Sequence, residues 1–107
     1  MKVEFAGFDW DRWNRDKCTK HGVSHFAIEA LFQGRVFISP APEPSFNEQR
    51  YIAIGETALG RKVMVVFAFR HKANGILLRP ISARFMHAKE VIKYEKLKEK
   101  SSGSKDR

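Results

Sequence analysis

The amino-acid sequence predicts a single small α+β domain: an antiparallel sheet of about four to five strands, two N-terminal helices and one C-terminal helix. Three observations lead to this fold class. The apolar patterns follow the order β-α-α-β-β-β-β-α along 107 residues, without an internal repeat. Asn74-Gly75 separates two apolar runs and is a strong hairpin signal. A content of 43% hydrophobic residues suffices for the core of one domain and excludes a disordered chain.

The first residues predict an edge strand followed by a short polar helix. Residues 3–8 form a brief apolar run, interrupted by Glu4, that suits a strand at the edge of a sheet. Asp9 or Asp11 can cap the next helix, because a carboxylate accepts hydrogen bonds from the free amides of a first helical turn. Gly22 then ends this helix.

A second helix and a strand follow. Ser24 is the predicted N-cap and Gly34 the end of a helix whose apolar stripe is Ala27, Ile28, Ala30, Leu31 and Phe32. Residues 35–39 have the composition of a strand. After them comes an extended loop that cannot join a sheet interior, because it contains Pro40, Pro42 and Pro44.

The second half of the chain predicts a three-stranded antiparallel meander. Residues 51–55 and 62–70 alternate between apolar and polar positions and are joined by a turn over 57–60. Asn74-Gly75 connects the second of these strands to a third over 76–83. The middle strand directs one face toward the core through Val63, Val65, Phe67 and Phe69.

The C-terminal pattern becomes helical from Phe85 or Met86 onward. Its Lys, Glu and Tyr residues are predicted to face outward, and its inward-facing residues are Ala88, Val91, Ile92 and Leu97. We expect residues 1–98 to form the single domain and residues 99–107 to form a flexible basic tail.

The positive charge of the chain is concentrated in one block. The net charge is +8, yet residues 1–60 carry seven basic and eight acidic groups. Residues 61–93 carry eight basic groups and one acidic group. This block also contains the predicted core strands, so the distribution fits either a surface that binds a polyanion or a solvated basic face.

Several classes of protein are excluded or disfavoured. No apolar stretch approaches the ~18–20 residues that cross a bilayer, and no secretory signal is present, so we expect a cytoplasmic protein that does not bind membranes. Cys18 is the single cysteine and is interpreted as a packing residue. Zinc is disfavoured because Gly22 and Ser24 separate His21 from His25 and no fourth ligand is evident. The sequence also contains no nucleotide-binding motif. We therefore expect the protein to use neither a metal nor a cofactor.

The remaining chemistry suits a phosphodiester. Arginine presents a planar fork of donors that matches phosphate oxygens and can stabilise the charge added during displacement at phosphorus. RNA is the apt substrate, because its own 2′-OH can attack the adjacent phosphate. A small protein then needs only a base, an acid and positioned positive charge.

Five residues near the strand ends are candidates for this chemistry. Arg79 and Arg84 lie near the end of the last strand, where they either contact a ligand or solubilise an edge. Arg70 closes its strand on the face opposite the apolar row and can line the same groove. Glu48 and Arg50 form either a surface ion pair or a base with a phosphate clamp.

The first helix supplies a second group of candidates. Lys17, Lys20 and His21 share its C-terminal end, where the helix dipole favours cations, and His21 is also a possible acid or base. Trp10 and Trp13 are interpreted as core residues rather than as platforms for stacked bases.

Four blocks of the sequence together resemble the BrnT toxin family. In order, they are Gly-Phe-Asp-Trp-Asp from Gly7, Lys-Cys-Thr-Lys-His-Gly-Val-Ser from Lys17, Glu-Gln-Arg-Tyr-Ile-Ala-Ile-Gly from Glu48, and Arg-Pro-Ile-Ser-Ala-Arg-Phe-Met-His-Ala-Lys-Glu from Arg79, followed by Tyr94. The resemblance extends from about Phe5 to Glu95. Lys17-Cys18 occupies a region where many members have an asparagine.

The resemblance implies a RelE-like endoribonuclease toxin of a bacterial type II toxin–antitoxin system, which inhibits translation. It implies neutralisation by a BrnA-like ribbon-helix-helix antitoxin, with operator DNA contacted only through that antitoxin. The alternative is a catalytically inactive module of the same fold that binds nucleic acid or antitoxin.

The resemblance also indicates site residues. Carried over by position, it points to Lys20, His21, Glu48, Arg50, Arg79, Ser82, Arg84, Glu90 and Tyr94. Our own inference assigns catalytic roles to His21, Glu48, Arg50, Arg79 and Arg84, and RNA-binding roles to Lys17, Lys20, Arg70, Ser82, Lys89 and Tyr94. Within this set we expect Arg79 and Arg84 on the scissile phosphate, with Glu48 or His21 as the base or acid.

Overall fold

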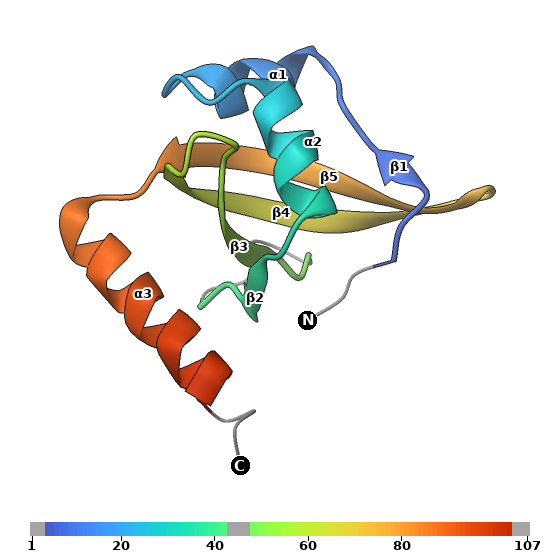
Figure 1. The fold of residues 1–107 in the computed structure, drawn as a ribbon. Helices are drawn as coiled ribbons and strands as arrows, with labels where there is room; N and C mark the ends of the chain where they lie inside the picture. The colour runs from blue at the N-terminus through green and yellow to red at the C-terminus, as the bar shows by residue number, and fades with distance from the viewer. Residues whose placement is uncertain (1–3, 43–47, 104–107) are drawn as a thin grey trace.

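The computed structural model describes residues 4–42 and 48–103 and has the predicted α+β architecture (Figure 1). Its five-stranded sheet has the spatial order β1-β5-β4-β3-β2. β1 pairs parallel to β5, and the other neighbours are antiparallel. The strands are β1 (Gly7–Phe8), β2 (Phe37–Pro40), β3 (Tyr51–Glu56), β4 (Lys62–Lys72) and β5 (Gly75–Phe85). The helices are α1 (Arg12–Thr19), α2 (His25–Gln33) and α3 (Ala88–Gly103).

The helix starts follow the predicted capping residues. Asp11 is the N-cap of α1, and its carboxylate accepts a hydrogen bond of 3.1 Å from the backbone N–H of Asn14. Ser24 caps α2 by accepting a 3.1 Å hydrogen bond from the backbone N–H of Ala27. Gly22 separates the two helices with a φ of 91°, a left-handed conformation that glycine adopts without steric cost.

The core lies between α2 and one face of the meander. Ile28 and Leu31 of α2 are buried there against Val63, Val65 and Phe67 of β4. The predicted alternation of β4 is therefore confirmed, because every second side chain of the strand points to the same face. The predicted first strand is shorter than expected: within residues 4–8 the strand covers Gly7–Phe8, with a further backbone hydrogen bond from Ala6 to Ile76, and Val3 lies outside the described residues.

The pairing of β4 with β5 contains one irregularity that matters for the site. Val66 pairs with Ser82, but the next residue, Phe67, pairs with Pro80, so β5 has one extra residue at Ile81. Such a bulge reverses the alternation of the strand beyond it. Arg79 and Arg84 therefore face the same side of the sheet, opposite the core.

The orientation of α3 differs from the prediction. Tyr94, predicted to face outward, is buried with 3% exposure, whereas Ile92, predicted to face inward, is 57% exposed. The ring of Tyr94 packs edge-on against Phe37 at 5.5 Å between ring centroids. The helix continues to Gly103. The outward assignment of Tyr94 was wrong because a tyrosine ring can be buried like other apolar groups while its hydroxyl remains hydrogen-bonded.

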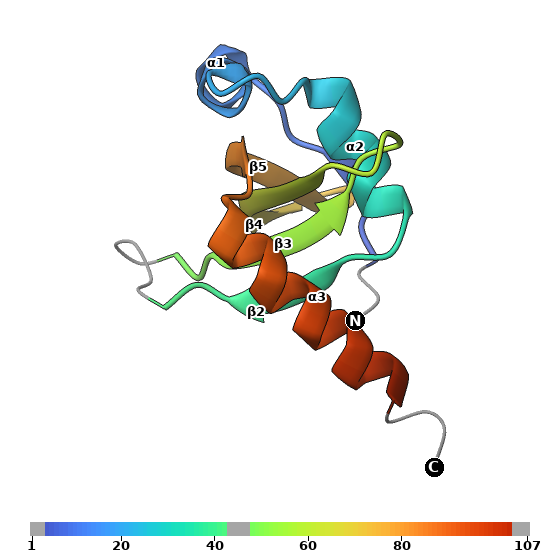
Figure 2. The same ribbon diagram turned by 60° about the vertical axis from the view of Figure 1, so that its left-hand side comes forward.

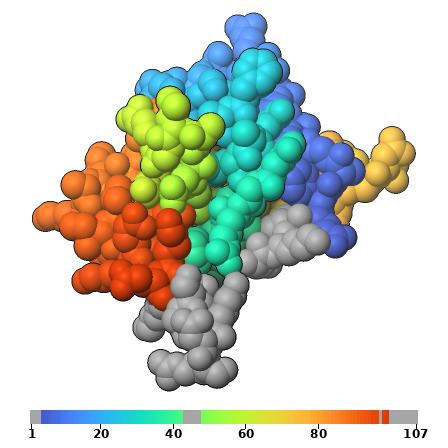
Figure 3. Space-filling view, in the orientation of Figure 1, coloured from blue at the N-terminus to red at the C-terminus, as the bar shows by residue number. Residues whose placement is uncertain are grey.

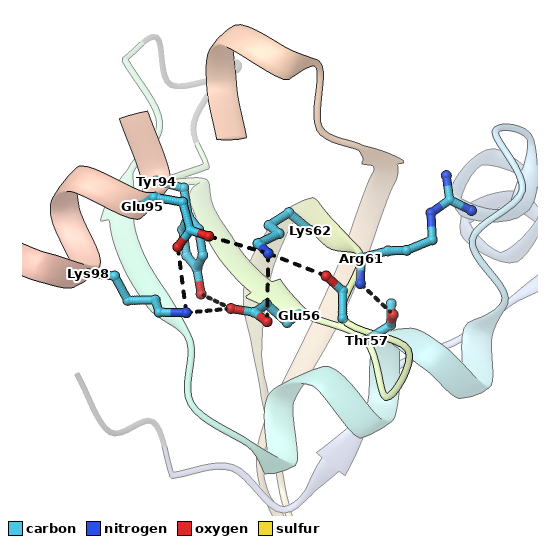
Figure 4. A network of polar contacts seen from close by, with 8 residues as sticks. Glu56, Thr57, Arg61, Lys62, Tyr94, Glu95 and Lys98 are labelled. Atoms are coloured by element: carbon cyan, nitrogen blue, oxygen red, sulfur yellow. Dashed lines mark hydrogen bonds and ion pairs between the residues drawn. The ribbon is translucent and has the colours of Figure 1, made fainter. Parts of the chain in front are cut away.

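A polar network holds this orientation of α3 (Figure 4). Glu56, the last residue of β3, accepts hydrogen bonds of 3.4 Å from the Tyr94 hydroxyl and 2.8 Å from Lys98 Nζ. Lys62 of β4 lies between Glu56 and Glu95, at 3.9 and 3.4 Å. Figures 1 and 2 show that α3 lies apart from α1 and α2 and projects beyond the sheet.

Candidate functional site

A groove lined by cations lies between α1 and the face of the sheet opposite the core. It has a volume of about 210 Å³ and is lined by Trp13, Asn14, Lys17, Arg50, Arg70, Arg79 and Ile81. Here this set of residues is called the cationic groove. Its four cations come from three distant parts of the sequence, so the groove exists only in the folded chain.

Strand register explains why three arginines meet in the groove. Arg79 on β5 pairs with Ala68 of β4, and Arg70 is two residues further along β4 on the same face. Arg50 directly precedes β3, whose first residue, Tyr51, pairs with Phe67. The arginines thus occupy neighbouring positions at one end of the sheet, as predicted for Arg70 and Arg79.

Arg79 is held in place by two carboxylates at the start of α1. Its guanidinium lies 3.6 Å from Asp9 and 2.9 Å from Asp11, and its side chain is only 18% exposed. The pKa of Asp11 is lowered, mainly because its carboxylate accepts a hydrogen bond from the backbone N–H of Asn14. The hydrogen bond and charge attraction of Arg79 lower it further. Capping of the helix and positioning of the arginine therefore depend on the same carboxylate.

Asn14 connects α1 to β5 beneath the groove. It is buried, with 4% exposure, and its side-chain amide donates to the carbonyl oxygens of Asp9 at 2.9 Å and Pro80 at 2.8 Å. Its side-chain oxygen accepts the backbone N–H of Asp11 at 2.7 Å. Sequence reasoning missed Asn14, although its position three residues after an N-cap aspartate is a capping-box signal.

Glu48 is shared by two arginines of the groove. Its carboxylate contacts Arg50 Nε at 3.4 Å and also forms an ion pair with Arg70. Each guanidinium carries five N–H donors, so one carboxylate leaves most of them available to a ligand. Glu48 also lines an adjacent cavity of about 350 Å³ together with His71, which the sequence analysis did not select.

Arg84 lies outside the cationic groove. Its β4 partner is Met64, four residues from the partner of Arg79, which corresponds to about 13 Å along the strand. Its guanidinium makes two 2.8 Å hydrogen bonds to the carboxylate of Glu90 in the first turn of α3. Arg84 therefore connects β5 to α3, and the expectation that it shares a phosphate with Arg79 has no support from this geometry.

The Arg84–Glu90 pair makes stability depend on pH. Glu90 has a pKa lowered to about 2, first by its hydrogen bonds to Arg84 and next by the backbone N–H of His87. A depressed folded-state pKa stabilises the fold above the ordinary value near 4.5, and this stabilisation is lost as pH falls toward 2. When the pH is lowered from 6 to 3, we expect the urea concentration at the midpoint of unfolding to fall less for Glu90→Gln than for wild type. Asp16→Asn, at an exposed position of α1, is the control; an equal loss in wild type and Glu90→Gln would contradict this assignment.

The other predicted site residues do not converge on the groove. Lys20 and His21 are exposed after the end of α1, where the adjacent Gly22 approaches the ring of Phe85. Ser82 is half-buried on β5, Lys89 is exposed in α3, and Tyr94 is buried in the network of Figure 4. Of the predicted set, the groove brings together Lys17, Arg50, Arg70 and Arg79, with Glu48 beside them.

The two tryptophans have different environments. Trp10 is half-buried and donates its indole N–H to Glu29 at 2.8 Å, in agreement with a packing role. Trp13 is 80% exposed at the groove, so its interpretation as a core residue was wrong. The reason is the docking of α1: Asn14 turns toward β5, and the neighbouring Trp13 lies on a side of the helix that this docking leaves uncovered.

A larger cavity of about 520 Å³ lies between α2 and the β3–β4 turn. Its lining is mainly apolar and includes Ala27, Leu31, Leu59 and Phe85. Figure 3 shows the β3–β4 turn beside α2 at the surface. The cavity lacks the clustered cations of the cationic groove: its one arginine, Arg61, stacks over the Phe85 ring at 3.5 Å, and its one carboxylate is that of Glu56.

Cys18 is completely buried, and burial raises the pKa of its thiol to about 11. This agrees with its predicted packing role, because a protonated buried thiol is a poor nucleophile and a poor metal ligand. In residues 4–42 and 48–103, no three His, Cys, Asp or Glu side chains are grouped to hold a metal ion. None of the helices described is long and apolar enough to cross a membrane.

A small α+β domain that gathers arginines, a lysine and a shared carboxylate on one face of its sheet is a protein equipped to act on a phosphate polyanion. Residues 10–90 match the family described as ribonuclease toxin, BrnT, of type II toxin–antitoxin system. The chain therefore belongs to the BrnT family of ribonuclease toxins. No individual curated protein matches it significantly. The matched segment contains the whole cationic groove and ends just after α3 begins.

Proposed function

We propose that this toxin is a metal-independent endoribonuclease that cleaves RNA at the cationic groove. The observation that carries the proposal is the convergence of Lys17, Arg50, Arg70 and Arg79 beside the carboxylate of Glu48. Positive charge fixed before the substrate arrives stabilises the charge that develops on a phosphate during displacement. The arginines and the lysine supply that charge themselves, so the reaction needs no metal ion for this purpose.

The reaction uses the 2′-OH of the substrate as nucleophile. Glu48 removes the 2′-OH proton, a bond forms between the 2′ oxygen and phosphorus, and the bond from phosphorus to the 5′ oxygen breaks. The departing 5′ oxygen takes its proton from solvent water, because His71 lies on the opposite face of β4 from Arg70. Arg70 and Arg79 bind the reacting phosphate, and Arg50 and Lys17 bind neighbouring phosphates. The products carry 2′,3′-cyclic phosphate and 5′-OH ends.

The toxin is held inactive by an antitoxin, which we propose to be a BrnA-like ribbon-helix-helix protein. Operator DNA is then contacted only through that antitoxin. The proposal places the toxin in the cytoplasm, where the RNA that it cleaves during translation arrest is found.

A specific observation also favours a second candidate, a binding module without catalysis. Glu48 forms ion pairs with Arg50 and Arg70, and Asp9 and Asp11 form ion pairs with Arg79. Three of the four groove cations are therefore already paired with carboxylates. An arrangement of this kind can bind an anion without accelerating its reaction. Expression of such a module would not arrest growth.

The test is cleavage of a mixed RNA substrate in excess EDTA by purified wild type, Arg79→Gln and Arg35→Gln. Arg35 is exposed and lies outside the groove, so its replacement removes the same charge elsewhere. We expect wild type and Arg35→Gln to leave 2′,3′-cyclic phosphate ends. Arg79→Gln should be slower by about 10²- to 10³-fold, the usual effect of losing one transition-state donor.

Circular dichroism must show that Arg79→Gln is folded, since Arg79 also contacts the cap of α1. Cleavage that requires added metal, or that leaves 3′-OH ends, would overturn the proposed mechanism. Absence of cleavage together with harmless expression of wild type would favour the binding module.

A further inference from the structure

Trp13 is an exposed aromatic side chain at a position where exposure needs an explanation. It is 80% exposed and lines the cationic groove, and it makes none of the aromatic contacts found elsewhere in the described parts of the chain. Leaving a large apolar side chain in water forgoes the favourable free energy of its burial. A ligand that covers the indole would recover part of this free energy.

The backbone beneath Trp13 is fixed. Trp13 lies between the two partners of the capping box, Asp11 and Asn14. Asn14 is hydrogen-bonded to Pro80 of β5, and Asp11 forms an ion pair with Arg79. The indole is therefore carried on a preorganised helical turn next to an arginine of the groove, which reduces the ordering cost of binding.

The surroundings of Trp13 select the chemical class of the ligand. Lys17, Arg50, Arg70 and Arg79 line the same groove, and cations next to an exposed aromatic ring are typical of sites that bind single-stranded nucleic acid. The mainly apolar cavity beside α2 is a separate site, lined by a different set of residues from the cationic groove. The cationic groove thus offers a π-face for a base and donors for its phosphates.

We propose that Trp13 is a base-binding subsite, on which an unpaired RNA base stacks while its flanking phosphate occupies the cationic groove. The inference rests on the proposed function in one respect, because it takes RNA as the ligand. It goes further by assigning a base-contacting residue, and it requires an unpaired base at the site. Paired RNA is therefore a poor ligand for this subsite.

Binding is tested with a short 2′-O-methyl oligoadenylate, which is uncleavable because its 2′ oxygen is blocked. An abasic 2′-O-methyl oligomer of equal length carries the same phosphates without bases. Trp10→Phe leaves Trp13 as the single tryptophan, since the chain has two. We expect the oligoadenylate to quench Trp13 fluorescence to saturation, and the abasic oligomer to bind with much weaker quenching.

Affinity measurements separate stacking from charge. Trp13→Ala should weaken oligoadenylate binding by about 5- to 150-fold, the range for one stacked base, and leave abasic binding unchanged. Trp13→Phe should restore most of the affinity. Phe26→Ala, which removes another exposed aromatic ring on α2, should bind like wild type.

Three outcomes of these binding experiments would overturn the inference. Unchanged oligoadenylate binding by Trp13→Ala, or an equal loss for both oligomers, would show that the indole does not stack on a base. Failure of wild type to bind either oligomer would do the same and would point to a protein contact at Trp13. Base-dependent binding without cleavage in EDTA would support the subsite and contradict only the catalytic proposal.

Discussion

Glu48→Gln is expected to slow RNA cleavage by about 10²- to 10⁴-fold, the usual effect of removing a general base. Glutamine keeps the size of the side chain and can still accept hydrogen bonds from Arg50 and Arg70. It cannot take the proton of a 2′-OH. The measurement is the single-turnover cleavage rate of a defined RNA in excess EDTA, compared with wild type.

A second measurement distinguishes catalysis from positioning. If Glu48 acts as the base, Glu48→Gln binds the uncleavable 2′-O-methyl oligoadenylate at least as tightly as wild type, because a negative charge beside the arginines has been removed. If binding falls in parallel with the rate, Glu48 instead positions Arg50 and Arg70. Glu29→Gln, which alters a carboxylate bonded to Trp10 and absent from the groove lining, should retain the wild-type rate.

Phe67→Ala is expected to lower the free energy of unfolding by about 3–5 kcal/mol, the typical cost of truncating a buried aromatic ring. Phe67 is completely buried and lies within 5.2–5.6 Å, between ring centroids, of Phe32, Tyr51 and Phe69. A small domain has only about 5–15 kcal/mol of stability, so the variant should unfold at a much lower urea concentration.

Phe26→Ala is the matched control because the same ring is removed from a position that is 71% exposed. Its effect should stay within about 0.5 kcal/mol. A loss below about 1 kcal/mol for Phe67→Ala would show that the region around β4 repacks easily. The arrangement of Arg70 on that strand would then not depend on a rigid core.

The elements of the fold were predictable because their signals are local. Asp11 and Ser24 provide side-chain oxygens at helix starts, and Asn74-Gly75 provides a backbone that accepts a tight turn. The alternation around Phe67 identifies the buried face of β4. Each of these features depends on residues within a few positions of one another, so tertiary contacts were not needed to recognise it.

The site was predictable only in part. The positive block and the family motifs selected Arg70, Arg79, Arg50 and Glu48, which the fold does bring together. They also selected Arg84, which the fold pairs with Glu90 about 13 Å along the strand from Arg79. A charge pattern records which residues are basic, but it contains no information about which carboxylate each will meet.

By itself, the sequence determined the class of fold, the order of its elements, the buried face of the meander and membership of a ribonuclease toxin family. Tertiary structure decided which residues share a surface. The bulge at Ile81 places Arg79 and Arg84 on one face, and the docking of Asn14 on β5 leaves Trp13 exposed at the groove. The physical reason is that strand register and helix docking are set by long-range packing and hydrogen bonds, whereas helix caps, turns and alternation are set by neighbouring residues.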